Sequence, residues 1–361
     1  MNHHRWSRSS SRMADGCHLA RLSVPSRPRT EKEGEVKSVL PLLLTIALGE
    51  GTLSAQGVAP STCDRQLKDG KAALDRGSHA EAEGLLAAAL KTCVGPAAHA
   101  SALANLGLAK MADGRTAEGA DLLGRSIAVL ESDPGTRDSD LALVWHALGS
   151  AWYYQKLYSQ AAKAFGNAIR LIEKHPDGNP LPLFDSLSCL ASVYIAQASY
   201  VEAQAAIDRA RSILDSTRPP ELLPRLKLLD KLGAVYDHQG RYDEALAVYL
   251  EISQQLDPAT DPFGTFPAGI WNNLAREYMR RGDYAAGADA LERAVSLLER
   301  GTPFSRSDVD LILTNYRICL RKMGTREQLR RFDARARAII NAVPHQADGL
   351  LVDVTAFRSV K

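Results

Sequence analysis

The sequence predicts an all-α protein built as an α-solenoid, a stack of antiparallel helix pairs. Alanine and leucine supply much of the 45% hydrophobic content and favour helices, while aromatic residues make up only 6%. No run of alternating apolar and polar residues is long enough to predict a sheet. A pattern of small residues recurs five times at a spacing of 42 residues. Self-similarity at such a period is typical of repeat architectures, in which each unit buries its apolar face against its neighbours.

Each repeat is marked by a small residue that follows a leucine. The markers are Gly107, Gly149, Ala191, Gly233 and Ala275. The register predicts a first helix that carries the marker, a turn, and a second helix with further small positions. Glycine inside a helix costs ~1 kcal/mol relative to alanine, so its recurrence at a fixed position indicates that packing needs the space. We therefore expect the small residues to allow close helix packing. Less regular pairs flank the five units, which extends the predicted solenoid to about seven helix pairs over residues 63–342.

The residues before the repeats are expected to be separate from the solenoid. Residues 1–35 are rich in Ser, Arg and His and predict a disordered segment, or an extension upstream of a true start at Val36. Residues 36–55 combine Lys37, an apolar run over 39–48 and small residues, which is typical of a secretory signal peptide. A buried apolar helix is the alternative. The run is shorter than the about 20 residues that span a bilayer. We therefore expect a secreted or periplasmic protein, with residues 343–361 as a C-terminal tail.

Two cysteines frame the first predicted helix pair. Cys63 and Cys93 each lie 15 residues from the turn near Ser78, so an antiparallel pair brings them together at its open end. Disulfides persist outside the reducing cytosol, and one here is expected to stabilise this pair by roughly 2–4 kcal/mol. Two free thiols at an exposed hairpin end are the alternative.

The repeat resembles the tetratricopeptide repeat. In the unit marked by Gly149 the residues that stand at that family's consensus spacings are Trp145, Leu148, Gly149, Tyr158, Ala161, Phe165 and Ala168. The 42-residue period and the stretch WNNLAREY…GDYAAGADALERAV are similar to the longer repeats of the kinesin light chain family. The resemblance covers roughly residues 63–342 and implies a right-handed superhelix with the first helix of each pair lining a concave groove.

The same resemblance implies which side chains face the groove. The peptide- or partner-binding candidates are Tyr153, Tyr154, Asp230, Asp237, His238, Asn272, Arg276, Met279, Arg280, Arg321 and Lys322. The kinesin light chain family uses asparagine at the position of Asn272 to bind a peptide backbone, and one of the five regular units keeps it here. The candidates run from aromatic through acidic to basic. This order predicts that an extended ligand binds the last two units through an acidic segment or a free carboxylate, and that Arg276 and Arg280 are exposed. The alternative is that these arginines pair with Glu277 and Asp310.

No catalytic constellation is present in the sequence. It lacks GxSxG, HExxH, a phosphate-binding GxxxxGK[ST] loop and a dinucleotide glycine fingerprint. We therefore expect a non-catalytic interaction scaffold that uses neither cofactor nor metal. The formal net charge of +2 argues against a dedicated nucleic-acid binder. Two alternatives stay open, namely polyanion binding through the basic C-terminal helices and a role as accessory subunit of an envelope enzyme complex.

Overall fold

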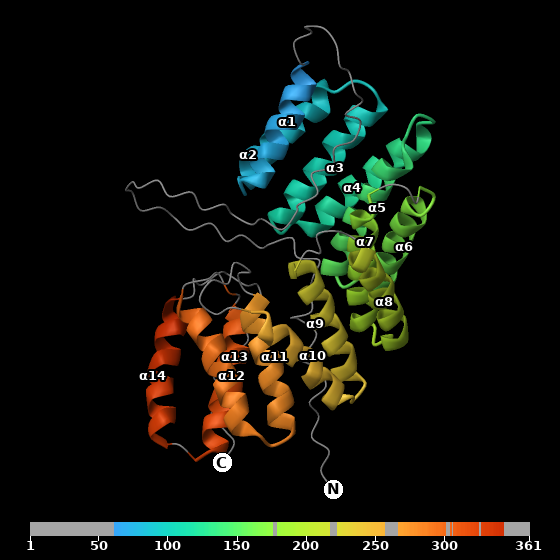
Figure 1. Cartoon of the computed structure of the whole chain (residues 1–361). Helices are drawn as coiled ribbons and strands as arrows, with labels where there is room; N and C mark the ends of the chain where they lie inside the picture. The colour runs from blue at the N-terminus through green and yellow to red at the C-terminus, as the bar shows by residue number, and fades with distance from the viewer. Residues whose placement is uncertain are drawn as a thin grey trace. The chain divides into compact units, whose positions relative to one another are not determined.

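The computed structural model describes residues 61–175, 179–216, 222–256, 266–300, 304, 306–324 and 326–342. The predicted N-terminal extension, signal peptide and C-terminal tail lie outside these residues. Within the described ranges the chain forms 14 α-helices and no strand (Figure 1). The all-α class and the solenoid of paired helices are confirmed.

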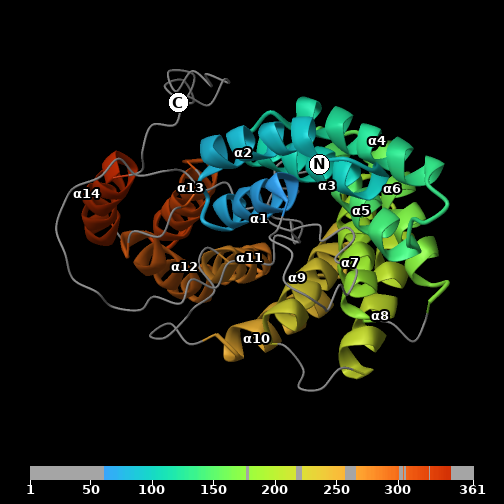
Figure 2. The ribbon, with the colours of Figure 1, turned by 90° about the horizontal axis from the view of Figure 1, so that it is seen from above.

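The chain divides into two compact units, and the division falls after Ile252. The first unit holds α1 (Thr62–Asp75), α2 (His79–Thr92), α3 (Pro96–Ala112), α4 (Thr116–Ser132), α5 (Asp138–Tyr154), α6 (Tyr158–Ile172), α7 (Leu181–Ala196), α8 (Tyr200–Ser216), α9 (Leu222–His238) and α10 (Tyr242–Gln254), which ends just past the division. The second unit holds α11 (Phe266–Arg280), α12 (Tyr284–Glu299), α13 (Arg306–Lys322) and α14 (Arg326–Ala342). Figure 2 shows the pairs of the first unit stacked on one another from α1–α2 to α7–α8.

The turn inside each pair requires a left-handed residue seven positions after the marker. Gly114, Gly240 and Gly282 supply it with φ of 82°, 77° and 79°. Lys156 and Ala198 adopt the same conformation, at 61° and 59°, although only glycine does so without steric cost. The Ser199 amide, for example, then donates to the Tyr194 carbonyl at 2.9 Å and closes the end of α7. The repeat therefore fixes the backbone of this turn even where its glycine is missing.

Two of the marker glycines, Gly149 and Gly233, are small because a ring from the second helix lies directly on them. A Cβ atom at Gly149 would come within 2.9 Å of Phe165, and one at Gly233 within 2.8 Å of Tyr249. Phe165 and Tyr249 both stand 16 residues after their marker and are almost fully buried. The close packing that the sequence predicted is confirmed, and it offsets the helical cost of glycine.

Candidate functional site

The predicted groove residues of the first unit lie mostly inside the fold. Tyr153 is only 8% exposed and its ring packs edge-on against Tyr154, with centroids 5.9 Å apart, and against Tyr158 at 5.8 Å. Asp230 and Asp237 are 4% and 5% exposed. Tyr153, Asp230 and Asp237 therefore offer a partner little surface, although the sequence placed them in the groove. Tyr153 is buried because it fills the junction between α5 and α6.

Tyr154 and His238 keep part of their surface in solvent. His238, at the end of α9, stacks on the ring of Tyr200 at the start of α8, with centroids 5.3 Å apart and an interplanar angle of 9°. Of the first-unit candidates, these two side chains remain available for a partner to contact.

A buried lysine links two first helices in the same unit and was missed by sequence reasoning. Lys231 on α9 is fully buried, and its Nζ donates to Ser192 Oγ on α7 at 2.7 Å. It stands two residues before its marker, where Asn105 and Asn273 stand in other repeats, and both asparagines are buried too. The repeat register was therefore the signal that could have identified this position as a buried polar one.

In the second unit, Asn272 is a structural contact. It is fully buried, and Asn315 Nδ2 on α13 donates to Asn272 Oδ1 on α11 at 2.8 Å. This differs from the peptide-binding role that the kinesin light chain resemblance implied. Met279 packs toward α12, where a Cβ atom at Gly287 would meet Met279 Cγ at 3.3 Å. The buried amide pair joins α11 and α13, so Asn272 is engaged within the fold, whereas Met279 keeps part of its surface exposed.

Arg276 and Arg280 flank a buried carboxylate. Glu277 is fully buried, with Oε1 3.8 Å from Arg276 Nη2 and Oε2 4.0 Å from Arg280 Nη1. The expected exposure of Arg276 is wrong, because its side chain is only 20% exposed. The alternative pairing with Glu277 is supported, whereas Asp310 pairs with Arg306 at 3.5 Å. Removing both arginines would therefore deprive a buried charge of its nearest cations and destabilise the unit.

Two basic candidates remain exposed at the C-terminal end of α13. Arg321 and Lys322 both lie in solvent, and Lys322 Nζ is 6.0 Å from the centroid of the Tyr284 ring. Arg280 ends α11 with its side chain 34% exposed. Lys322 follows Arg280 by 42 residues and so holds the same repeat position. We call Arg280, Arg321 and Lys322 the basic end of the second unit.

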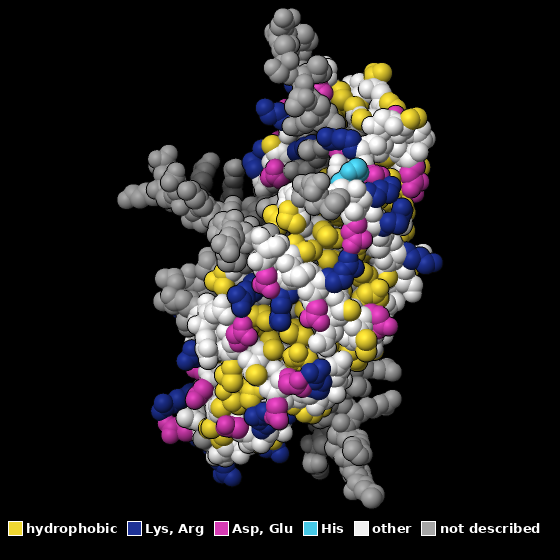
Figure 3. Space-filling model, turned by 45° about the vertical axis from the view of Figure 1, so that its right-hand side comes forward, with side chains coloured by type: hydrophobic (Ala, Val, Ile, Leu, Met, Phe, Trp, Pro, Cys, Tyr) yellow, Lys and Arg dark blue, Asp and Glu magenta, His cyan; other side chains and the backbone are white. Residues whose placement is uncertain are grey.

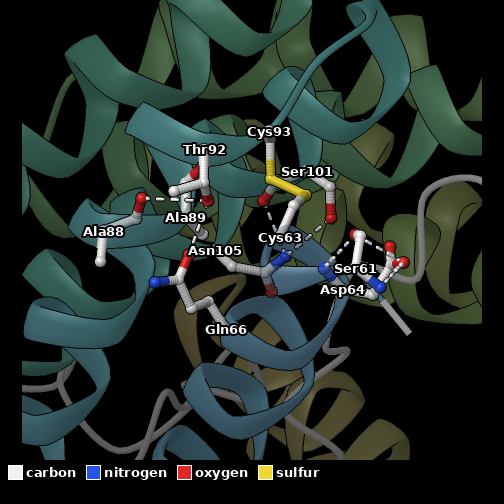
Figure 4. The surroundings of a disulfide bond; sticks show 10 residues. All are labelled: Ser61, Cys63, Asp64, Gln66, Ala88, Ala89, Thr92, Cys93, Ser101 and Asn105. Atoms are coloured by element: carbon white, nitrogen blue, oxygen red, sulfur yellow. Dashed lines mark hydrogen bonds between the residues drawn. A yellow bond between two sulfur atoms is a disulfide. The ribbon is translucent and has the colours of Figure 1, made fainter. Parts of the chain in front are cut away.

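The first helix pair carries the Cys63–Cys93 disulfide that the sequence predicted, with Cα atoms 4.8 Å apart (Figure 4). Beside it, Thr92 Oγ1 donates to Gln66 Oε1 at 2.6 Å, which adds a second tie between α1 and α2. Ser61 caps α1 through a reciprocal contact with Asp64. The start of the first unit is thus held by covalent and polar contacts at one end of the pair.

Charge and metal chemistry give no further centre within the described part of the chain. On the face drawn in Figure 3, Lys and Arg side chains are interspersed with Asp, Glu and apolar side chains. No group of three or more His, Cys, Asp and Glu side chains among the described residues is placed to hold a metal ion. None of the described helices is both long and apolar enough to cross a bilayer.

Stacked antiparallel helix pairs with small residues at a fixed period define a helical-repeat protein of the α-solenoid class. Within that class, residues 183–254 match the model of the tetratricopeptide repeat family. This stretch covers most of α7 and all of α8, α9 and α10, so the tetratricopeptide resemblance is confirmed.

Solved structures share the fold at low identity. The apo form of RapI is 14% identical with a TM-score of 0.59, over 78% of this chain and 97% of that one. NprR in complex with its cognate peptide NprX is 11% identical with a TM-score of 0.54, over 77% and 79%. The repeats of a Podosopora anserina putative kinesin light chain are 19% identical with a TM-score of 0.47, over 54% and 96%. No curated protein matches the chain.

Proposed function

We propose that this chain is a non-catalytic scaffold that binds a partner protein or an extended peptide, with the basic end of the second unit as its contact for an acidic segment or a free carboxylate. The tetratricopeptide match and the fold shared with peptide-bound NprR support the class of function. The observation that carries the site is the exposure of Arg321 and Lys322 at the end of α13, with Arg280 at the repeat position on α11 that is equivalent to Lys322.

The arrangement of α11 and α13 supports this site. The Asn315–Asn272 bond joins the two helices, and Arg280 and Lys322 occupy equivalent repeat positions at their C-terminal ends. Arginine offers a planar fork that matches a carboxylate, and lysine adds a flexible point charge. Cations at these positions also stabilise helix C-termini, so binding and stability have to be measured separately.

The test replaces Arg321 and Lys322 together with alanine. The probe is a fluorescein-labelled peptide of alternating Asp and Glu with a free C-terminus, measured by fluorescence anisotropy at fixed salt. Loss of two charge-assisted contacts should weaken binding by about tenfold or more. The matched control changes Arg330 and Arg337, two exposed arginines on α14, to alanine and removes the same charge.

Equal weakening in both double variants, or none in either, would contradict the basic end as the binding site. A heparin fragment that binds more tightly than the peptide, with affinity falling steeply as salt rises, would favour the polyanion alternative instead. Circular dichroism of each variant shows whether the helices remain intact.

We also propose that the chain acts outside the reducing cytosol, either alone or as an accessory subunit of an envelope complex. The Cys63–Cys93 disulfide and the apolar run over residues 39–48 support this location. Cell fractionation followed by thiol alkylation tests it. Recovery of the chain from the cytosol with both cysteines alkylated would contradict export.

A further inference from the structure

A pocket of about 640 Å³ lies within the first unit, between the N-terminal halves of α5 and α7 and the C-terminal end of α6. Its walls include Ala142 and Leu143 of α5, Leu171 and Ile172 of α6, and Pro182 of α7. Ala142 and Leu171 are only 2% and 3% exposed, so they form its inner wall. Pockets of this size with mostly apolar walls and a few convergent polar groups are typical ligand sites.

A histidine–serine pair is one polar group of this pocket, in addition to Asn179 and the charged residues at the rim. His146 Nδ1 on α5 lies 3.0 Å from Ser186 Oγ on α7, and both residues line the pocket. The imidazole also packs edge-on against Phe165, with centroids 5.3 Å apart. Burial lowers the pKa of His146 to about 4, so the ring is neutral at neutral pH. Ser186 engages Nδ1, and Nε2 is the second hydrogen-bonding atom of the ring.

The charged residues that line the pocket each lie near an opposite charge, and for Asp185 that charge is Lys227. Arg137 donates from Nε and Nη2 to the two oxygens of Asp140, at 2.9 Å each. Asp138 accepts from Lys174 Nζ at 3.3 Å and contacts His175 Nε2 at 3.1 Å. A charged ligand would lose hydration on entry and would compete with these pairs, whereas an uncharged group meets no such cost.

We infer that this pocket binds an uncharged aromatic side chain, tyrosine or tryptophan, of the partner. This assignment rests on the proposed scaffold function and adds an anchor in the first unit. Tyrosine and tryptophan combine an apolar body, which suits the aliphatic walls, with one hydrogen-bonding edge, which suits the His146–Ser186 pair. Buried aromatic anchors in pockets dominate the binding energy of many interfaces.

The test uses side-chain analogues and the whole chain, so it does not depend on knowing the partner. Saturation-transfer NMR titrations compare 3-methylindole, which is neutral, with indole-3-acetate, which carries a carboxylate. Ser139→Trp places an indole at the rim from an exposed position. Ser212→Trp on α8 is the matched control, since that serine is also exposed and does not line the pocket.

We expect saturable binding of 3-methylindole, and binding of indole-3-acetate that is weaker by about tenfold or more. Ser139→Trp should weaken 3-methylindole binding by at least about tenfold, while Ser212→Trp leaves it unchanged. His146→Phe should weaken 4-methylphenol more than toluene, because only the phenol uses the polar edge.

Absence of saturable binding by the neutral analogues, or equal affinity in the parent and Ser139→Trp chains, would overturn the assignment. So would tighter binding of indole-3-acetate than of 3-methylindole. These outcomes are independent of the acidic-peptide assay on Arg321 and Lys322. The pocket can therefore fail while the basic end stands, and the reverse also holds.

Discussion

Among the described residues, the first and last helix pairs are stabilised by different physical means. The α1–α2 pair is closed by the Cys63–Cys93 disulfide. The α13–α14 pair has one cysteine, Cys319, which is free and buried. The last helix, α14, buries only three residues, Phe332, Ala336 and Ile339. A terminal helix with so little apolar burial needs other contacts to hold it.

Ion pairs supply those contacts in the second unit. Arg335 on α14 bonds Glu299 at 2.9 and 3.0 Å and Glu292 at 3.0 Å, and both glutamates lie on α12. Tyr316 donates to the same Glu292 at 2.7 Å. Burial raises the pKa of Glu292, but the bonds from Arg335 and Tyr316 outweigh it and hold that pKa below its usual value. The stability of the α1–α2 pair therefore depends on redox state, and that of α14 depends on salt.

Breaking the disulfide should give the largest effect. Changing Cys63 and Cys93 to serine frees the 30-residue loop in the unfolded chain, so the α1–α2 pair should lose about 2–4 kcal/mol. Hydrogen exchange should show faster opening in residues 62–92 and no change in residues 306–342. Cys319→Ala serves as the control for loss of a thiol. Unchanged exchange of α1 and α2 would contradict a stabilising disulfide.

Removing Arg335 should loosen the other end. Arg335→Ala loses the contacts to Glu292 and Glu299, and α14 should open more easily by about 1–2 kcal/mol. Because the pairs are partly exposed, 0.5 M salt should weaken the parent and leave the variant less affected. Arg330→Ala replaces an exposed side chain on the same helix, and it should change neither the opening of α14 nor its response to salt. If 0.5 M salt weakened only α1 and α2 and left α14 unchanged, ion pairs would not be what holds α14.

Mild acid should distinguish the units, because described residues 266–342 contain no histidine. The pKa of His146 is about 4 in the folded first unit against an ordinary 6.5, so the unfolded chain takes up a proton first as pH falls. Stability is therefore lost between pH 6.5 and 4, by about 1–2 kcal/mol given that the residue keeps some exposure. His146→Gln should flatten this decline in urea melts. An equally steep decline in the variant would exclude His146 as its source.

The smallest expected effect concerns an interior turn. Both end pairs have glycine in their turns, Gly77 at φ 73° and Gly324 at 71°, whereas Ala198 adopts φ 59° without that freedom. Ala198→Gly should raise the free energy of unfolding by about 0.5–1 kcal/mol and leave the contrast between the ends unchanged. Ala128→Gly, at an exposed position in the interior of α4, should lower it by about 1 kcal/mol. The same sign for both variants would contradict strain at Ala198.

Local and periodic features were predictable from the sequence. The 42-residue register identified the markers and the turn positions and predicted close packing at the small residues, because every repeat solves the same packing problem. The structure then showed that the rings of Phe165 and Tyr249 cover Gly149 and Gly233. The pairing of Cys63 with Cys93 followed from equal distances to one turn. In both cases a short stretch of chain and helix geometry suffice to bring the residues together.

The tertiary structure decided which polar side chains are exposed to a partner. Asn272 and Arg276 hold groove positions in the register, yet Asn315 engages one and Glu277 lies beside the other. The pocket around His146 is lined by residues of α5, α6 and α7 and therefore exists only when the three helices are packed together. The sequence by itself thus determined the repeat, its turns and its disulfide. Side-chain exposure and the Asn315–Asn272 pair needed the folded structure, because Asn315 comes from the next repeat, 43 residues after Asn272.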